Sequence, residues 1–251
     1  MNREIYTKIV SKTEKGEKML VVLLDPEKCI NERLDKTLFE LKKKQPDFIF
    51  VGGSTKKYST DTLLEALKDI DVPTIVFPGD VSQFSNKADA LLLLSLLSGD
   101  NPDYLIGQQR RGALDIKKSK VEVIPTAYLL IDGGKKSSVE RVSKTEPISR
   151  LDIGEVVSTS VAGELLGMKL VYLEAGSGAL LPISSQMISA VKNELDIPLI
   201  VGGGIRTEKA LKRAYESGAD IVVIGNLFET ESKKISSFIS LVEKINEESK
   251  K

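Results

Sequence analysis

The chain of 251 residues contains no histidine and a single cysteine, Cys29. Without histidine, a serine–histidine–aspartate triad, an HExxH zinc site and an imidazole general base are all excluded. One cysteine excludes an internal disulfide and, in a chain without histidine, a tetrahedral zinc site built from soft ligands. Any catalysis must therefore use carboxylates, hydroxyls, lysines, backbone amides or a hard cation.

An excess of charge of one sign is also absent, as are long apolar runs. The 36 lysines and arginines balance 36 aspartates and glutamates, so we expect no nucleic acid as a partner. The longest apolar run, residues 90–97, is interrupted by Ser95 and is far too short to span a bilayer. The first ten residues lack the apolar core of a signal peptide, and with the lone cysteine this predicts a cytoplasmic protein without a transmembrane segment.

Short apolar runs alternate with helical patterns along the whole chain. We predict strands over residues 19–24, 48–51, 74–77, 90–94, 122–130, 170–174, 198–202 and 220–224. We predict helices over residues 31–44, 60–70, 101–114, 155–167, 184–194, 207–217 and 231–247. Continuous apolar strands separated by helices, in a chain of this length, favour a closed TIM-type (β/α)8 barrel, an α/β fold, over an open doubly wound sheet. No linker interrupts the pattern, so we expect one domain over residues 1–251.

One connection is too short for a regular helix. Only twelve residues, PGDVSQFSNKAD, separate the strand ending at Phe77 from the strand beginning at Ala90. A parallel crossover with a helix needs about a dozen residues or more, and Pro78 and Gly79 oppose helix formation here. We therefore predict a modified barrel in which the third helix is missing or degenerate. The leucine-rich residues 90–97 could line an apolar groove beside this gap, although a core strand is the simpler interpretation.

Glycine clusters lie directly after the last two predicted strands, where many barrels bind a phosphate. They are Gly202-Gly203-Gly204 and Gly225-Asn226. Glycine lets backbone N–H groups approach an anion closely, and a helix beginning beyond the loop adds a favourable dipole. Tight turns would explain one cluster equally well, but two clusters on consecutive final loops favour anion binding.

The segment that ends the sixth predicted strand combines a carboxylate with a glycine-rich loop. Its residues are Tyr172, Leu173, Glu174, Ala175, Gly176, Ser177 and Gly178. The loop can offer amides and a hydroxyl to the same anion, and Glu174 would project into the mouth of the barrel. In a chain without histidine, Glu174 is a natural candidate for the general base, the alternative being a structural salt bridge to a lysine or arginine.

Asp25 closes the first predicted strand and Ser54 follows the second, so a carboxylate and a hydroxyl lie at neighbouring strand ends. Mg²⁺ is usually bound by one or two such oxygen ligands, with substrate phosphates completing its shell. Each residue taken alone is better explained by a turn, but together with a phosphate site they favour a metal site. After the fifth strand, residues 133–136 (GGKK) suggest a mobile flap over the barrel mouth.

Eight motifs, in order along the chain, resemble one known family. They are LLDPEK, FVGGST, PTIVFPGD, ADALLLLSLLSG, IPTAYLLIDGG, YLEAGSGA, IVGGGIRT and VVIGN. Together they resemble the geranylgeranylglyceryl phosphate synthases, and more closely the second group of that family, which has bacterial members and is related to heptaprenylglyceryl phosphate synthase. The resemblance extends from about residue 20 to residue 228. The motifs YLEAGSGA, FVGGST and LLDPEK are specific, whereas GGGI alone matches many barrels.

The resemblance implies a modified barrel without its third helix and an Mg²⁺-dependent prenyltransferase of phospholipid biosynthesis. Such an enzyme joins a prenyl diphosphate, most often geranylgeranyl diphosphate, through an ether to the 3-hydroxyl of sn-glycerol 1-phosphate and releases diphosphate. By this resemblance Glu174 is the catalytic base, and Asp25 and Ser54 coordinate Mg²⁺. The residues that would bind glycerol phosphate are Tyr172, Leu173, Glu174, Ala175, Gly176, Ser177, Gly178, Gly203, Gly204, Gly225 and Asn226.

The family also implies a homo-oligomer, either a dimer or a hexamer, and a transient membrane contact for the lipid substrate. Donor length and the identity of the phosphorylated acceptor stay open. Two other functions stay open as well. An isomerase or lyase acting on a sugar phosphate would share the last two glycine loops but need neither the groove nor the pair Asp25 and Ser54. A binding protein for polar lipids or nucleotides would bind ligand without turnover.

Overall fold

The computed structural model describes residues 4–53 and 59–250. The strands follow one another in chain order, β1 to β8, in a closed barrel. This confirms the α/β barrel of the TIM type that the alternating pattern predicts. The chain divides into two compact units, each described by itself below: unit 1 comprises residues 1–92, 112–123 and 224–251, and unit 2 comprises residues 93–111 and 124–223. That the chain forms a single domain stays a prediction.

Unit 1 holds the first strands and the last helices of the chain. Its elements are α1 (Glu4–Glu14), β1 (Met19–Leu24), α2 (Asn31–Lys43), β2 (Phe48–Val51), α3 (Thr60–Leu67), β3 (Thr74–Val76), η1 (Val81–Gln83), the start of β4 (Ala90–Leu96), the end of α4 (Gln108–Lys118), α9 (Asn226–Thr230) and α10 (Lys234–Glu248). Its strands pair in parallel, with Val22 opposite Ile49 and Phe50 opposite Ile75. Every residue of β2 and β3 is buried, as expected for parallel strands covered on both faces.

The connection between β3 and β4 contains no regular helix, although the structure describes all of its residues. Its only helical element is η1, a single 3-10 turn. The Ser82 N–H donates to the Asp80 carboxylate, and the Gly79 N–H donates to the Gln83 side chain, so the turn is held by its own side chains. The structure thus confirms that the third helix of the barrel is missing.

Helix α1 was not predicted from the sequence. Ile5 and Ile9 on this helix are buried. The N–H groups of Ile5 and Tyr6 donate to the Glu122 carboxylate at 2.8 and 2.9 Å, which satisfies donors at the helix start. Because Glu122 is 117 positions from Ile5, this cap leaves no local signal in the sequence.

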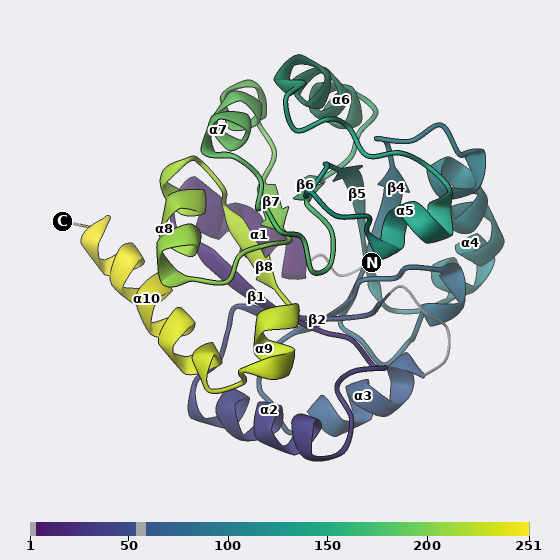
Figure 1. The fold of residues 1–251 in the computed structure, drawn as a ribbon. Coiled ribbons are helices and arrows are strands. Elements are labelled where there is room, and N and C mark those ends of the chain that lie inside the picture. The colour runs from purple at the N-terminus through teal and green to yellow at the C-terminus, as the bar shows by residue number, and fades with distance from the viewer. Residues whose placement is uncertain (1–3, 54–58, 251) are drawn as a thin grey trace. The chain divides into compact units, whose positions relative to one another are not determined.

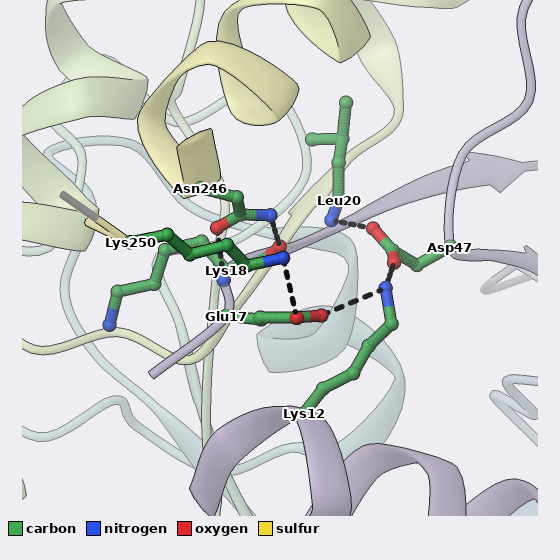
Figure 2. Close-up of polar contacts among 7 residues, drawn as sticks. All are labelled: Lys12, Glu17, Lys18, Leu20, Asp47, Asn246 and Lys250. Atoms are coloured by element: carbon green, nitrogen blue, oxygen red, sulfur yellow. Dashed lines mark hydrogen bonds and ion pairs between the residues drawn. The ribbon is translucent and has the colours of Figure 1, made fainter. Parts of the chain in front are cut away.

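Polar side chains join α10 and α1 to the start of β1 in unit 1 (Figure 2). Asn246 accepts a hydrogen bond from the Lys18 N–H at 2.7 Å and donates one to the Lys18 carbonyl at 2.9 Å. Asp47 accepts a hydrogen bond from the Leu20 N–H and forms an ion pair with Lys12. The C-terminal helix therefore fixes the residue that precedes β1 through hydrogen bonds between the Asn246 side chain and the Lys18 main chain.

Unit 2 holds the remaining strands and their helices. Its elements are the rest of β4, a π-helical turn η2 (Asp103–Gly107), the start of α4, most of β5 (Glu122–Leu130), α5 (Ser138–Ser143), α6 (Ile153–Leu165), β6 (Leu170–Glu174), α7 (Ser185–Glu194), β7 (Leu199–Gly202), α8 (Glu208–Glu216) and most of β8 (Ile221–Ile224). In this unit α6 packs against α7, and α7 packs against α8 (Figure 1). Among the helices that the structure describes, none combines the length and the apolar composition needed for a membrane span.

Candidate active site

The carboxyl ends of β5, β6 and β7 bring one set of predicted residues together in unit 2. The strand register places Glu174 beside Leu130 of β5 and beside Gly202 of β7. Directly after β6, the Ala175 N–H donates to the Gly202 carbonyl at 3.0 Å. Glu174 therefore lies at the edge of the sheet where TIM-type barrels carry their catalytic groups.

Two glycines at the end of β7, Gly202 within the strand and Gly203 directly after it, leave the space that the Glu174 carboxylate occupies. A Cβ on Gly202 would lie 2.4 Å from the Tyr172 hydroxyl and 2.7 Å from Glu174 Oε2. A Cβ on Gly203 would lie 2.6 Å from Glu174 Oε1, and the φ of Gly203, +82°, is one that other residues rarely adopt. The glycine cluster therefore permits close packing around the carboxylate, in addition to any role in binding an anion.

Glu174 is a buried carboxyl group with a raised pKa. Its side chain is buried, and Oε1 accepts a hydrogen bond from the Gly176 N–H at 2.7 Å. Burial raises the pKa of Glu174, while interactions with the Tyr172 hydroxyl and the Gly176 N–H lower it and offset part of this effect. Within the described residues no lysine or arginine forms an ion pair with Glu174, so the salt-bridge alternative is not observed.

Two tyrosines lie next to this carboxylate in the core of unit 2. The rings of Tyr128 on β5 and Tyr172 on β6 meet edge to face, with centroids 5.3 Å apart. Burial, and then the Glu174 carboxylate, raise the pKa of both hydroxyls well above its ordinary value. Both tyrosines therefore stay protonated at neutral pH and can donate hydrogen bonds. Tyr128 was absent from the predicted site, because nothing local distinguishes it from a core residue of its strand.

The loop after β6 is shaped by glycine and packs against the loop after β5. Gly176 has a φ of +96°, and a Cβ there would lie 2.7 Å from the Ser137 Cβ. The Gly133 carbonyl accepts hydrogen bonds from the N–H groups of Leu180 and Leu181. Main-chain hydrogen bonds thus join Gly133 to the β6 loop, where the sequence suggested a mobile flap.

The other predicted residues of this segment differ in burial, and so in the groups that a ligand could reach. Leu173 and Ala175 are buried, and Leu173 alternates along the strand with Tyr172 and Glu174, so its side chain belongs to the opposite face of β6. Ser177 is exposed and Gly178 partly exposed, so their polar groups are accessible to solvent. Gly204, after β7, has a φ of +72° and packs against the backbone of residues 181–182.

Unit 1 contains the predicted metal ligand Asp25. Asp25 Oδ1 accepts a hydrogen bond from the Glu27 N–H at 2.9 Å, and Oδ2 lies 3.7 Å from Lys28 Nζ. Its carboxylate lies directly against Gly53, where a Cβ would be only 2.6 Å from Oδ1. Ser54, the second predicted ligand, lies outside the described residues. No group of three or more His, Cys, Asp or Glu side chains suited to a metal ion is found in the part of the chain that the structure describes.

A second carboxylate in unit 1, absent from the predicted site, holds Lys28. The side chain of Glu229 on α9 is only 7% exposed, and its Oε2 lies 3.2 Å from Lys28 Nζ. Burial raises the pKa of Glu229, and Lys28 lowers it. In the same unit Gly225 precedes α9 and packs against Leu23 of β1. Asn226 begins α9, so these two predicted residues belong to unit 1, whereas Glu174 belongs to unit 2.

The lone cysteine offers no ready nucleophile. Cys29 is buried, and burial raises the pKa of its thiol to about 11. Since the thiolate is the attacking species, the protonated thiol is unreactive at neutral pH.

Comparison with known proteins connects this geometry to one family. The model of the PcrB family matches residues 12–242. The chain is 47% identical over 230 residues to geranylgeranylglyceryl phosphate synthase of Flavobacterium johnsoniae, covering 91% of this chain and 95% of that protein. A relative from Zunongwangia profunda with the same name is 47% identical over 228 residues, covering 90% of this chain and 97% of that protein.

The crystal structure of a relative has the same fold as this chain. The crystal structure of (S)-3-O-geranylgeranylglyceryl phosphate synthase from Thermoplasma acidophilum, in complex with substrate sn-glycerol-1-phosphate, matches with a TM-score of 0.88 and 36% identity. The match covers 96% of this chain and 98% of that one. Near-complete coverage at this identity extends well beyond the glycine loops that many barrels share. The chain therefore belongs to the PcrB family, and with it to the geranylgeranylglyceryl phosphate synthases, which are prenyltransferases.

Proposed function

We propose that this enzyme transfers a geranylgeranyl group from geranylgeranyl diphosphate to the 3-hydroxyl of sn-glycerol 1-phosphate, forming an ether and releasing diphosphate. The observation that carries the proposal is Glu174, a buried carboxylate between the glycine loops that follow β6 and β7. The names of the relatives and the sn-glycerol-1-phosphate in the Thermoplasma structure support this choice of substrates.

The acceptor would be held by the loops of unit 2. We assign acceptor binding to the segment from Tyr172 to Gly178, together with Gly203 and Gly204. Because the Ala175 and Gly176 N–H groups donate to the Gly202 carbonyl and to Glu174, we assign the phosphate contacts within this segment to Ser177 and Gly178. Glycines with positive φ turn the main chain so that N–H groups can point at an anion. For Gly225 and Asn226, in the other unit, the assignment rests on the resemblance of the motif VVIGN.

Glu174 would act as the general base. The oxygen of the glycerol 3-hydroxyl forms a bond to C1 of the prenyl chain while the bond from C1 to the diphosphate oxygen breaks. The bonding pair leaves with diphosphate, and the hydroxyl proton passes to the Glu174 carboxylate. A pKa raised by burial suits this task, because the carboxylate must accept and hold a proton during the step. Fixing the acceptor next to C1 contributes further, since proximity is worth roughly 7–11 kcal/mol at best.

The donor set of unit 1 fits Mg²⁺. The Asp25 carboxylate lies over the bare Cα of Gly53, where any side chain would displace it, and one of its oxygens already accepts a backbone hydrogen bond. One or two oxygen ligands are the usual protein contribution to Mg²⁺ when substrate phosphates supply the others. We therefore propose that Asp25 and Ser54 hold the ion. When bound, Mg²⁺ neutralises charge on the diphosphate, and Lys28, fixed by Glu229, would add to this effect.

A donor series tests the proposal directly. The purified chain is incubated with Mg²⁺, sn-glycerol 1-phosphate and prenyl diphosphates from geranyl to heptaprenyl, and products are resolved by mass. We expect an ether product, with the fastest turnover for geranylgeranyl diphosphate. A faster reaction with a longer donor would correct the chain length but keep the reaction. No ether with any donor, together with turnover of a sugar phosphate, would favour the isomerase or lyase alternative.

We further propose that the enzyme works in the cytoplasm as a dimer or hexamer and contacts membranes transiently. The buried free thiol of Cys29 is consistent with a reducing compartment. Light scattering after size-exclusion chromatography tests the oligomeric state, and a monomeric mass would contradict it.

A further inference from the structure

We propose that one surface of unit 2 docks on an anionic lipid membrane. This surface, called the basic–leucine rim below, consists of residues 133–144 and the pair Leu180 and Leu181. The choice of a membrane as partner rests on the proposed function, since that reaction joins a prenyl chain to a glycerol phosphate and so makes an amphiphilic lipid.

The two parts of the rim follow neighbouring parallel strands and are joined to each other. The Gly133 carbonyl accepts hydrogen bonds from the Leu180 and Leu181 N–H groups at 3.0 and 3.1 Å. A Cβ on Gly134 would lie 3.4 Å from Leu181 Cδ1, so the two loops are in van der Waals contact. The Arg150 guanidinium donates to the carbonyls on both sides, that of Asp132 and that of Pro182, at 3.2 Å each. The rim is therefore one continuous surface with a fixed backbone.

The apolar part of the rim is exposed to water. Leu180 is 62% exposed and Leu181 is 46% exposed, although large apolar side chains are usually buried. Val142, on α5 within the rim, is 41% exposed. Adjacent exposed leucines next to a polar loop have the composition of segments that insert shallowly at the boundary between lipid headgroups and acyl chains.

The rim also carries unpaired positive charge, although the chain as a whole is neutral. Residues 133–144 contain Lys135, Lys136, Arg141 and Lys144 but one carboxylate, Glu140. Glu140 is engaged with the Ser137 N–H in a capping box, and Arg141 donates to a backbone carbonyl and a serine hydroxyl. Across the described residues, none of the three lysines forms an ion pair. The acidic residues on either side are Asp132, whose carboxylate accepts from the Gly134 N–H, and the exposed Glu146.

Charge complementarity identifies the occupant as an anionic lipid surface. Lysine side chains near such a surface each add attraction, and leucines beside them add burial in the headgroup region. An acidic protein would match the lysines but gives no reason for the two exposed leucines beside them. The rim also adjoins the β6 loop that we assign to the acceptor, since Ser137 packs against Gly176. Docking there would bring the membrane to the loop from which the lipid product leaves.

Co-sedimentation of the full-length protein with vesicles tests this proposal. Vesicles of phosphatidylcholine with about one third phosphatidylglycerol are compared with vesicles of pure phosphatidylcholine, at low and at high salt. We expect binding to the anionic vesicles that weakens with salt, and little binding to the neutral ones. In Lys135→Gln/Lys136→Gln, partitioning should weaken roughly thirtyfold, the factor for two cations near an anionic surface. Leu180→Ser/Leu181→Ser should weaken partitioning to the vesicles as well. Because the two lysines and the two leucines are exposed, both double variants should fold.

Matched controls separate the rim from general charge and hydrophobicity. Lys117→Gln/Lys118→Gln removes two exposed lysines at the end of α4, and Leu165→Ser/Leu166→Ser removes two exposed leucines at the end of α6. Both controls should bind vesicles like the native chain. Absence of binding to anionic vesicles, or equal losses in controls and rim variants, would overturn the proposal. Prenyl transfer in detergent without vesicles reports on the proposed function alone, so the two ideas can fail separately.

Discussion

Replacing Glu174 by glutamine separates the chemistry of this carboxyl group from its packing. Glutamine has nearly the same shape, and its side-chain oxygen can still accept the hydrogen bond from the Gly176 N–H, which measures 2.7 Å in the native site. The amide cannot take up the hydroxyl proton, however. We therefore expect kcat to fall by about 10²–10⁴-fold, the range for loss of a general base.

The same substitution should stabilise the fold. Burial raises the pKa of Glu174, so the folded chain holds this proton more tightly than the unfolded chain. Native stability consequently falls as the pH rises from the ordinary carboxyl pKa through the raised pKa of Glu174, because the unfolded chain releases the proton first. Glu174→Gln carries no ionisable group at this position, so it does not lose stability in this way as the pH rises. We expect it to be more stable by about 0.5–2 kcal/mol at neutral to alkaline pH, with the difference shrinking as the pH falls towards the ordinary carboxyl value.

Two measurements check this prediction. Product formation gives kcat, and urea unfolding followed by circular dichroism gives the free energy of unfolding at acidic and alkaline pH. Glu194→Gln, at an exposed position on α7, is the matched control and should change neither quantity. Unimpaired turnover in Glu174→Gln would refute the role as base. A variant less stable than the native chain at alkaline pH would refute the reasoning from burial.

Three further predictions concern packing, metal and fold. If Glu174 is the base, Gly202→Ala should lower kcat about 100-fold by displacing its carboxylate, and it should destabilise the fold by about 1–3 kcal/mol. Gly163→Ala, whose added Cβ would lie 2.6 Å from a neighbouring Cβ, should cost similar stability but keep turnover. Chelation with EDTA should abolish turnover reversibly, and undiminished activity in EDTA would contradict the metal site. Asp25→Asn should raise the Mg²⁺ concentration that gives half-maximal activity about tenfold or more. Asn246→Ala removes both hydrogen bonds that Asn246 makes to the main chain of Lys18, so urea unfolding should show a loss of about 1–3 kcal/mol.

Most strands of the barrel could be predicted from local composition. Strands β2, β5 and β6 have the predicted bounds, because an apolar run buried on both faces is visible without knowledge of its neighbours. The missing third helix was predictable from the length and composition of one connection, since the residues between β3 and β4 are few and include Pro78 and Gly79.

Features that depend on distant partners were not predictable. The start of α1 is capped by Glu122, and Lys28 is paired with Glu229 on α9, so each contact joins residues far apart in the sequence. At the candidate site, the place of Glu174 at the end of β6 follows from the pattern. Its contact with Gly202 does not, because that depends on the register between two strands.

The hydrogen bonds between Asn246 and Lys18 determine when unit 1 can be completed during synthesis. Its hydrogen bonds connect residues 228 positions apart, and unit 1 is assembled from residues 1–92, 112–123 and 224–251. During translation these two hydrogen bonds to the residue before the first strand cannot form until the last helix emerges from the ribosome. Strands β6 and β7, which are neighbours in the sequence, can pair earlier. A C-terminal truncation that removes Asn246 therefore also removes the hydrogen bonds that hold the residue before the first strand made.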